Sequence, residues 1–339
     1  MSRLPWLVGP VYDLTYFIGA GLPLCLLLLL NRAPAAVALP FYVLGLGIVG
    51  GSHFFGTWTI THLDPAMRQR DPWRYGWVAV LVLVGAFSAA AVHLPLLINL
   101  SIYWGIYHQT KQHFGFIQLY KAKARDFNRF DYHIGKWLLF SGHLVAVLYA
   151  ASRRPQEVAG FGGVPLYWLP LPTWLLGALA AVFAGLLGVW LVRLTRKEHF
   201  AWPPVLMMAS ALAQYFIAFL LARDFLLAYL ITNVAHSVQY QALVWFYNRT
   251  KYAKAPEAKP GVAALFRGRN GLLYLGAAGL YAALVGALEK SGDFARMTVT
   301  YGFMGLIIYH YIVDAWIWRK QHNPDLIENL RLNEGGRSS

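Results

Sequence analysis

Apolar residues run along most of this chain in stretches near 20 residues, with short polar breaks between them. A helix rises 1.5 Å per residue, so a stretch of about 20 apolar residues crosses the hydrocarbon core of a bilayer. The pattern predicts an all-α, polytopic integral membrane bundle of about ten transmembrane helices. The expected spans are 12–30, 37–62, 77–92, 96–120, 132–151, 173–192, 204–221, 225–247, 271–288 and 297–318.

The breaks between these stretches predict turns and loops. A short turn is expected at His93-Leu94-Pro95, between the third and fourth spans. Residues 152–172 are rich in Gly and Pro and predict an external loop, whereas residues 248–270 are basic and predict a cytoplasmic loop. No internal repeat or separate soluble region is evident, so we expect one transmembrane domain over residues 1–339.

Composition agrees with a membrane protein and narrows the chemistry. Charged residues make up 13% of the chain, about half of what a soluble domain carries. The formal net charge of +14 would suggest nucleic acid in a soluble protein, but here we interpret it as topology signals and contacts with membrane lipids. The single cysteine, Cys25, excludes an intrachain disulfide, an iron–sulfur cluster and a thiolate zinc site.

Lysine and arginine also predict the orientation. With an even number of spans, most of the basic residues fall on the side that holds both termini. The positive-inside rule then places both termini in the cytoplasm, and we expect a bacterial inner membrane.

Seven of the eleven histidines fall at nearly one depth within these spans. Counted from the cytoplasmic ends, all but His62 lie roughly 12–20 Å deep. Ionisable groups in a bilayer are costly and usually face the bundle interior, where they bind, pair or relay protons. A layer of imidazoles from several helices is what a buried metal site requires. The candidate ligands are His53, His62, His108, His113, His143, His236 and His310, together with Asp314.

Helical spacing adds neighbours to these histidines. Asp314 lies four residues after His310, on the same helix face, and it is the only carboxylate that we place inside an apolar span. There it is either a further ligand or the acceptor that orients the imidazole. Candidate residues for orienting ligands or handling protons are Gln109, Gln112, Gln239 and Tyr240.

Two of the candidates rank lower. His53 and His62 are nine residues apart, which puts them on opposite faces of a regular helix, so His62 pairs with Asp64 at the rim unless the glycines of this span distort it. His143 taken alone is more typical of a hydrogen-bonded core histidine than of a ligand.

The donor set suits iron, zinc, copper or manganese, because it combines neutral imidazoles with a carboxylate and no thiolate. Its size exceeds one tetrahedral zinc, so we expect non-haem iron, as one ion or two, with haem and zinc as alternatives. A site surrounded by apolar side chains favours a lipid-like substrate, and oxidation by iron suits a hydrocarbon.

Two short segments carry a family resemblance. The segment His108 to Phe116, with His113-Phe114-Gly115-Phe116, resembles the paired-histidine helix of the Brp/Blh-type β-carotene-cleaving dioxygenases, and Gly51-Ser52-His53 resembles an early element of that group. The resemblance implies a polytopic protein whose histidines hold a non-haem iron. Membrane desaturases and hydroxylases are similar in logic only, because this chain lacks their closely spaced histidine boxes. The alternative is a separate histidine-rich membrane family.

The leading hypothesis from sequence is therefore a membrane non-haem iron oxygenase or desaturase. It would act on a lipid or isoprenoid, with its metal in the cytoplasmic half of the bilayer, and it would use a redox partner but bind no nucleic acid. Two other classes remain open: a haem-binding electron-transfer protein, and a proton-coupled transporter with a histidine relay.

Overall fold

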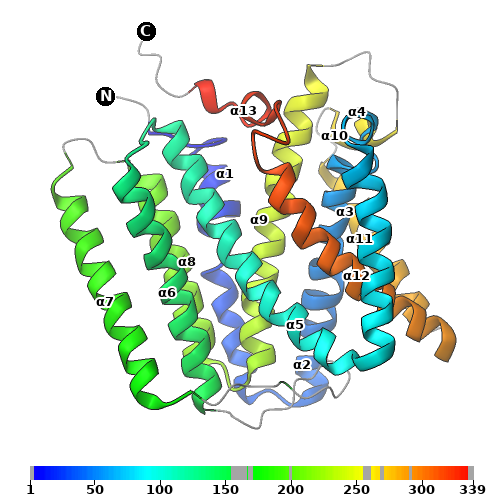
Figure 1. Ribbon diagram of the computed structural model, residues 1–339, viewed down its shortest axis with the longest axis horizontal. Helices are drawn as coiled ribbons and strands as arrows, with labels where there is room; N and C mark the ends of the chain where they lie inside the picture. The colour runs from blue at the N-terminus through cyan, green and yellow to red at the C-terminus, as the bar shows by residue number, and fades with distance from the viewer. Residues whose placement is uncertain are drawn as a thin grey trace. The chain divides into compact units, whose positions relative to one another are not determined.

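The computed structural model of the chain describes residues 4–153, 166, 171–197, 201–254, 261–267, 271–289 and 292–334. Within these ranges the regular structure is entirely helical, with no strand, which confirms the all-α prediction. Figure 1 shows long helices joined by short connections.

Seven helical stretches among the described residues are long and apolar enough to cross a membrane. They are Pro10–Arg32, Ala35–Ile60, Trp73–Lys123, Arg129–Arg153, Thr173–Thr195, Trp202–Leu221 and Gly271–Leu288. These helices are compatible with an integral membrane protein, as predicted. The number of ten spans and the cytoplasmic termini stay predictions.

The chain forms two compact units that are interleaved in sequence. The first unit contains residues 1–38, 107–236 and 331–339, and the second contains residues 39–106 and 237–330. Two long helices, α5 (Val78–Lys123) and α9 (Phe225–Ala253), contribute residues to both.

The first unit is built around α6 (Arg129–Arg153), which packs against α7 (Thr173–Thr195) and α8 (Trp202–Leu221). Its other elements are α1 (Pro10–Tyr12), the π-helix η1 (Asp13–Ile18), and the 3-10 helices η2 (Pro23–Arg32) and η5 (Leu332–Glu334). Gly142 allows α6 to approach α7 and α8 closely, because a Cβ there would lie 2.5 Å from the Leu212 side chain and 2.8 Å from Phe183.

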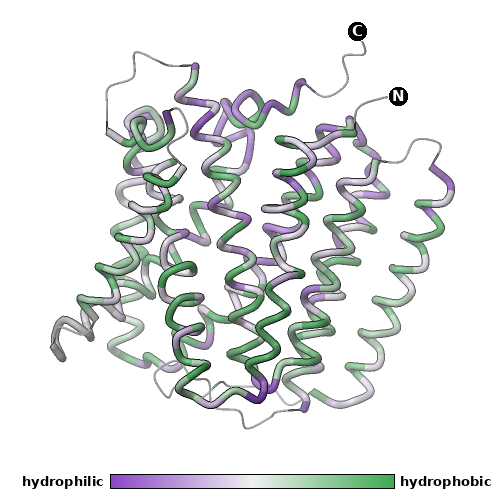
Figure 2. The backbone as a smooth tube through the Cα atoms, turned by 180° about the vertical axis from the view of Figure 1, so that it is seen from behind, coloured by the Kyte–Doolittle hydropathy of each residue, from purple (hydrophilic) through white to green (hydrophobic). Residues whose placement is uncertain are grey.

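Helix α7 forms the least buried part of this unit. None of its residues is buried, although it is apolar along its length. Figure 2 shows hydrophobic residues over α7 and hydrophilic ones at its end, where Arg193 and Lys197 form ion pairs with Asp131. An exposed apolar helix that ends in charge is typical of a lipid-facing span.

The second unit packs α11 (Gly271–Glu289) against α3 (Gly50–Ile60), the π-helix η3 (Val43–Val49) and α12 (Asp293–Ile317). The helix before η3 is α2 (Ala35–Tyr42), which straddles the boundary between the units. The shorter elements of the second unit are α4 (Pro65–Arg70), η4 (Trp73–Trp77), α10 (Val262–Phe266) and α13 (Leu326–Asn329). Helix α3 also contacts α12, and this contact positions the candidate site.

Helix α5 is bent sharply at the predicted turn. His93 has non-helical backbone angles (φ −156°, ψ 77°), and Pro95 follows inside the helix. Proline lacks the N–H that a helix interior needs, its ring clashes with the carbonyl four residues earlier, and it disfavours helical angles in the residue directly before it. The His93 ring accepts the Leu96 N–H at 3.1 Å, and Figure 1 shows the helix folding back there.

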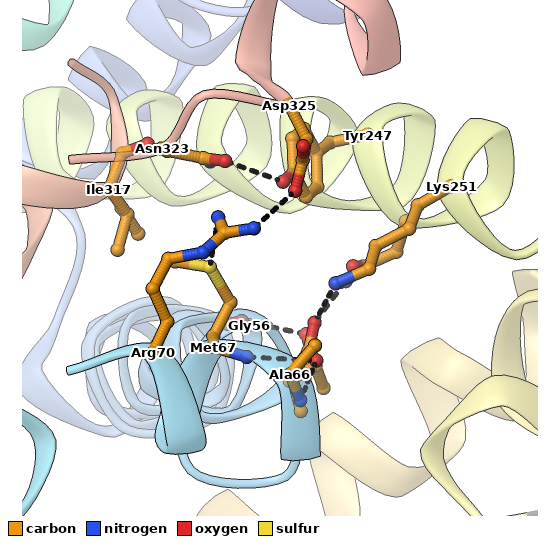
Figure 3. Close-up of polar contacts among 12 residues, drawn as sticks. Gly56, Ala66, Met67, Arg70, Tyr247, Lys251, Ile317, Asn323 and Asp325 are labelled. Carbon is orange, nitrogen blue, oxygen red and sulfur yellow. Dashed lines mark hydrogen bonds and ion pairs between the residues drawn. The ribbon is translucent and has the colours of Figure 1, made fainter. Parts of the chain in front are cut away.

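A polar network fixes the end of α9 within the second unit (Figure 3). The Tyr247 hydroxyl donates to Asn323 Oδ1 at 3.1 Å, and the Asn323 amide donates to the Ile317 carbonyl at 3.0 Å. Lys251 pairs with Asp64. These contacts hold α9 as a helix to Ala253, inside the range 248–270 where the sequence predicted a loop. Most of the other predicted loop, 152–172, lies outside the described residues.

Asp13 corrects one expectation. It lies in an apolar candidate span and is buried, so Asp314 is not the only such carboxylate. The Asp13 carboxylate accepts backbone N–H groups from Leu7 at 2.6 Å and Val8 at 3.1 Å. It therefore stabilises the turn before α1 rather than belonging to the histidine layer.

Candidate metal centre

Three helices of the second unit bring the candidate chemistry together. Helix α3 supplies His53 and Thr57, α9 supplies Ser237 and Tyr240, and α12 supplies His310 and Asp314. All six side chains are buried. On each helix the two residues are three or four positions apart, so each helix presents them from one face.

His53 and His310 face each other through one nitrogen of each ring. The two Nε2 atoms are 3.2 Å apart, and the rings are nearly perpendicular, at 77°. Asp314 lies beside the same nitrogen, with its Oδ2 3.6 Å from His310 Nε2. The predicted four-residue pair on α12 therefore points at His53, a residue 257 positions away in sequence.

The far nitrogen of His53 is held by the backbone. His53 Nδ1 lies within hydrogen-bonding distance of the Gly50 carbonyl oxygen and 3.3 Å from Ser237 Oγ. A carbonyl oxygen only accepts, so Nδ1 carries the proton and donates it. In the neutral ring Nε2 is then a lone-pair donor of the kind that a metal ion binds.

A chain of hydroxyl groups links His310 to Asp314. His310 Nδ1 lies 2.7 Å from Thr57 Oγ1, and Thr57 Oγ1 lies 2.8 Å from the Tyr240 hydroxyl. The Tyr240 hydroxyl in turn donates to Asp314 Oδ1 at 2.8 Å. His310 is thus oriented through Nδ1 and Asp314 through Oδ1. The atoms that lie near each other, His310 Nε2 and Asp314 Oδ2, are not used in this chain.

Two separations among these side chains, both measured from His310 Nε2, fit ligands of one metal ion. Metal–nitrogen bonds of about 2.0–2.1 Å place two ligand atoms of one ion roughly 3–3.6 Å apart, depending on the bond angle. The separations of 3.2 Å and 3.6 Å fall in this range. Axial ligation of haem would need the two nitrogens about 4 Å apart on opposite sides of the iron. The separation of 3.2 Å between His53 Nε2 and His310 Nε2 therefore fits two ligands of a bare ion better than the axial ligands of haem.

The first unit holds its histidines differently. His143 Nε2 lies 3.2 Å from the Ala211 carbonyl and must donate to it, and His143 Nδ1 accepts from the Thr110 hydroxyl at 2.9 Å. Its ring stacks on Tyr215 with the ring centroids 3.5 Å apart. Both ring nitrogens are thus engaged by the protein, which is the arrangement of a structural histidine.

The other predicted ligands of this unit form ring pairs. The rings of His108 and His236 are perpendicular, with centroids 5.0 Å apart, and His113 packs edge-on against His143 at 5.6 Å. Gln112 donates to the His236 carbonyl at 3.1 Å. The first unit therefore gathers four of the predicted histidines, all of them buried.

The predicted polar residues divide between the two units. Gln109 accepts from the Tyr215 hydroxyl at 3.0 Å and so supports the stack on His143. Tyr240 contacts Asp314 in the second unit, where Gln239 is also buried on α9. Of the four residues predicted to orient ligands or handle protons, Tyr240 contacts the proposed ligands most directly.

His62 lies apart from the candidate centre. It follows the end of α3, and its ring packs on Trp58 and Tyr309 with centroids 4.5 Å and 5.6 Å away. The expected rim pair with Asp64 is not formed. Asp64 instead caps α4, accepting the Ala66 N–H at 3.0 Å, and pairs with Lys251. An N-cap and a lysine satisfy this carboxylate better than a neutral ring would.

Sequence reasoning missed three hydroxyl residues that fix the histidines. They are Thr57 and Ser237 in the second unit and Thr110 in the first. A signal existed for Thr57, because it lies four residues after His53 on the same helix face. Ser237 and Thr110 sit among polar neighbours with no spacing that marks them.

Comparison with known proteins gives no relative: no protein-family model, curated protein or solved structure matches the chain. The resemblance to β-carotene-cleaving dioxygenases therefore stays a prediction.

Proposed function

We propose that this chain is an integral membrane metalloenzyme that oxidises a lipid or isoprenoid with a non-haem iron ion. The observation that carries the proposal is the meeting of two imidazole nitrogens and one carboxylate in the second unit, with Nε2–Nε2 and Nε2–Oδ2 separations of 3.2 Å and 3.6 Å. His53, His310 and Asp314 are the proposed ligands.

The ligand set is the basis for choosing iron. Two histidines and one carboxylate, leaving other coordination positions open, are typical of non-haem iron oxygenases, although zinc also binds such sets. When bound, iron would activate dioxygen, the oxidant that attack on unactivated C–H and C=C bonds requires. The protein would hold the ion away from bulk water, because all three ligand side chains are buried.

The apolar helices support the choice of substrate. A lipid or isoprenoid partitions into the same apolar medium that the spans occupy, and it can approach a buried site from the side. We further propose that α9 and α12 cross the membrane and that α5 crosses twice, once on each side of His93. Helix α9 has 29 residues and α12 has 25, so both are long enough for a span.

The topology that we propose keeps both termini in the cytoplasm of a bacterial cell, as the basic residues predict. Cysteines introduced one at a time near residue 7 and near residue 330, in a Cys25→Ser background, would test this with a membrane-impermeant thiol reagent. Labelling in spheroplasts at either position would overturn the orientation.

Metal analysis tests the function. The full chain, purified in detergent and reconstituted anaerobically with Fe(II), is expected to retain about one or two iron ions per chain and to show no Soret band. His53→Ala and His310→Ala should lose the iron. A Soret band would show haem instead of non-haem iron. Stoichiometric zinc in place of iron would exclude an oxygenase. Metal content unchanged in both variants would exclude His53 and His310 as ligands.

A further inference from the structure

In the second unit the Thr57 hydroxyl lies between His310 Nδ1 and the Tyr240 hydroxyl, 2.7 Å from the first and 2.8 Å from the second. Whether this hydroxyl gives its hydrogen to His310 or takes one from it decides which nitrogen of His310 carries the ring proton. That choice matters, because a metal ion binds only the nitrogen that lacks a proton.

The direction follows from counting hydrogens. The Tyr240 hydroxyl has one hydrogen and donates it to Asp314 Oδ1, a carboxylate oxygen that accepts. Tyr240 must then accept the hydrogen of Thr57. The Thr57 hydroxyl, having used its one hydrogen, must accept from His310 Nδ1. The proton of a neutral His310 ring is therefore on Nδ1.

His310 Nε2 is then a lone pair, and so is His53 Nε2, because His53 Nδ1 donates to the Gly50 carbonyl. The two lone pairs are directed at one another across 3.2 Å. A cation bound by both nitrogens is attracted to each lone pair. Both Nε2 atoms are therefore in the unprotonated form that a metal ion binds.

We propose that Tyr240 is a positioning residue that sets the metal-binding tautomer of His310 through the Thr57 hydroxyl. Its purpose rests on the proposed function, but the tautomer itself is a property of the metal-free protein. Tyr240 touches neither Nε2 atom; it acts by fixing the direction of the hydrogen bond that Thr57 makes.

Removing the Tyr240 hydroxyl should reverse that direction. In Tyr240→Phe the Thr57 hydroxyl loses its acceptor and becomes able to donate to His310 Nδ1, which moves the ring proton to Nε2. Iron affinity should fall about 10- to 100-fold, as is typical when a group that orients a metal ligand is lost. Part of this loss also reflects Asp314, which loses the phenol as a donor.

A double variant separates the two contributions. Tyr240→Phe with Thr57→Val removes the hydroxyl that holds the wrong tautomer, while Asp314 is in the same state as in Tyr240→Phe alone. The double variant should therefore bind iron several-fold more tightly than Tyr240→Phe alone. A merely structural role for Thr57 predicts the opposite, since deleting a second buried hydrogen-bonding group would weaken the site further.

The tautomer can be observed without metal. In the metal-free chain labelled with ¹⁵N-histidine, the ring nitrogen shifts of His310 should report the Nδ1–H form in the wild type and in Thr57→Ser. Tyr240→Phe should shift them to the Nε2–H form. Tyr247→Phe is the matched control, because Tyr247 lies two turns further along α9 and donates to Asn323 instead.

The outcomes are separable. If His310 keeps the Nδ1–H form in Tyr240→Phe, or if the double variant binds iron more weakly than Tyr240→Phe, the inference is overturned even where the protein binds iron. If the tautomer shifts as expected and the protein binds no metal, the positioning role of Tyr240 stands and the proposed function fails. Thermal unfolding of each variant establishes that it is folded.

Discussion

His143 and His310 are both buried histidines on long helices, yet the protein uses their rings in opposite ways. In the first unit, His143 donates from Nε2 to the Ala211 carbonyl and accepts at Nδ1 from Thr110. In the second unit, His310 makes its Thr57 bond through Nδ1 and turns Nε2 toward another imidazole and a carboxylate. Burial alone thus does not identify a ligand; the partner of each nitrogen does.

The largest expected difference is in metal binding. His310→Ala should lower iron affinity by more than about 100-fold, because it removes a ligand rather than a group that orients one. His143→Ala should keep the wild-type iron content and lose thermal stability instead. Elemental analysis and unfolding temperatures of the two variants, side by side, check this. Equal loss of iron in both would abolish the distinction between the two histidines.

Substitution of a glycine near each of the two histidines should affect different properties, the stability of the protein near His143 and its iron affinity near His310. Gly142→Ala forces a methyl group against Leu212 and Phe183, and overpacking of this kind costs about 2–3 kcal/mol. Gly56→Ala instead places its methyl group 3.0 Å from the Tyr274 hydroxyl and 3.2 Å from the Tyr240 ring, so it should lower iron affinity roughly tenfold by displacing Tyr240. Gly188→Ala, with nothing within 4 Å, is the control. Unfolding in detergent micelles and iron titration measure the two effects.

Thr110 offers a smaller test of the structural role of His143. Thr110→Val removes the hydroxyl that donates to His143 Nδ1 and leaves a buried acceptor unsatisfied, which costs about 1–2 kcal/mol. Thr110→Ser keeps the hydroxyl and should retain the wild-type stability, and the iron content should be unchanged in both variants. A fall in bound iron in Thr110→Val would place His143 among the ligands after all.

The smallest effect is expected at the end of α7. Burial alone would lower the pKa of Lys197, but its hydrogen bonds to Asp126 and Asp131, each 2.8 Å long, outweigh burial and raise the pKa above 10.5. While the two aspartates are ionised, the stabilisation is complete below pH 10.5 and is lost as the pH rises through the folded-state pKa of Lys197.

Lys197→Met should therefore destabilise the chain by about 1 kcal/mol at pH 7, with the same difference at pH 9. The unfolding temperatures of wild type and variant should converge only above about pH 10.5. Convergence near pH 8 would contradict the raised pKa of Lys197. Iron content should not change, because this ion-pair cluster belongs to neither histidine set.

Much of the fold could be predicted from the sequence because hydropathy alone defines helices of membrane length. The bend at His93 was also predictable, since Pro95 removes a backbone donor there. The distortions in η1 and η3 were not, because a π-turn depends on how neighbouring helices pack. Nor was the extension of α9 to Ala253, which depends on contacts with α4 and the 317–325 segment.

The site was only partly predictable for a related reason. Helical spacing links His310 to Asp314, since both lie on one turn of one helix. That His310 meets His53, while His143 meets Ala211, depends on tertiary contacts between residues far apart in sequence. The predicted depth in the membrane is similar for all these histidines and so does not distinguish them. Their hydrogen-bond partners do, above all Thr57 and Thr110, but no periodic spacing in the sequence marks those partners.

The interleaving of the two units also bears on biosynthesis. His53 emerges early from the ribosome, but His310 is made 257 residues later. Contacts of such long range form late and expose the chain to competing interactions while it waits. A nascent protein that has not yet released α12 lacks two of the three proposed ligands, so loading of the proposed ion would have to follow synthesis and insertion of nearly the whole polypeptide.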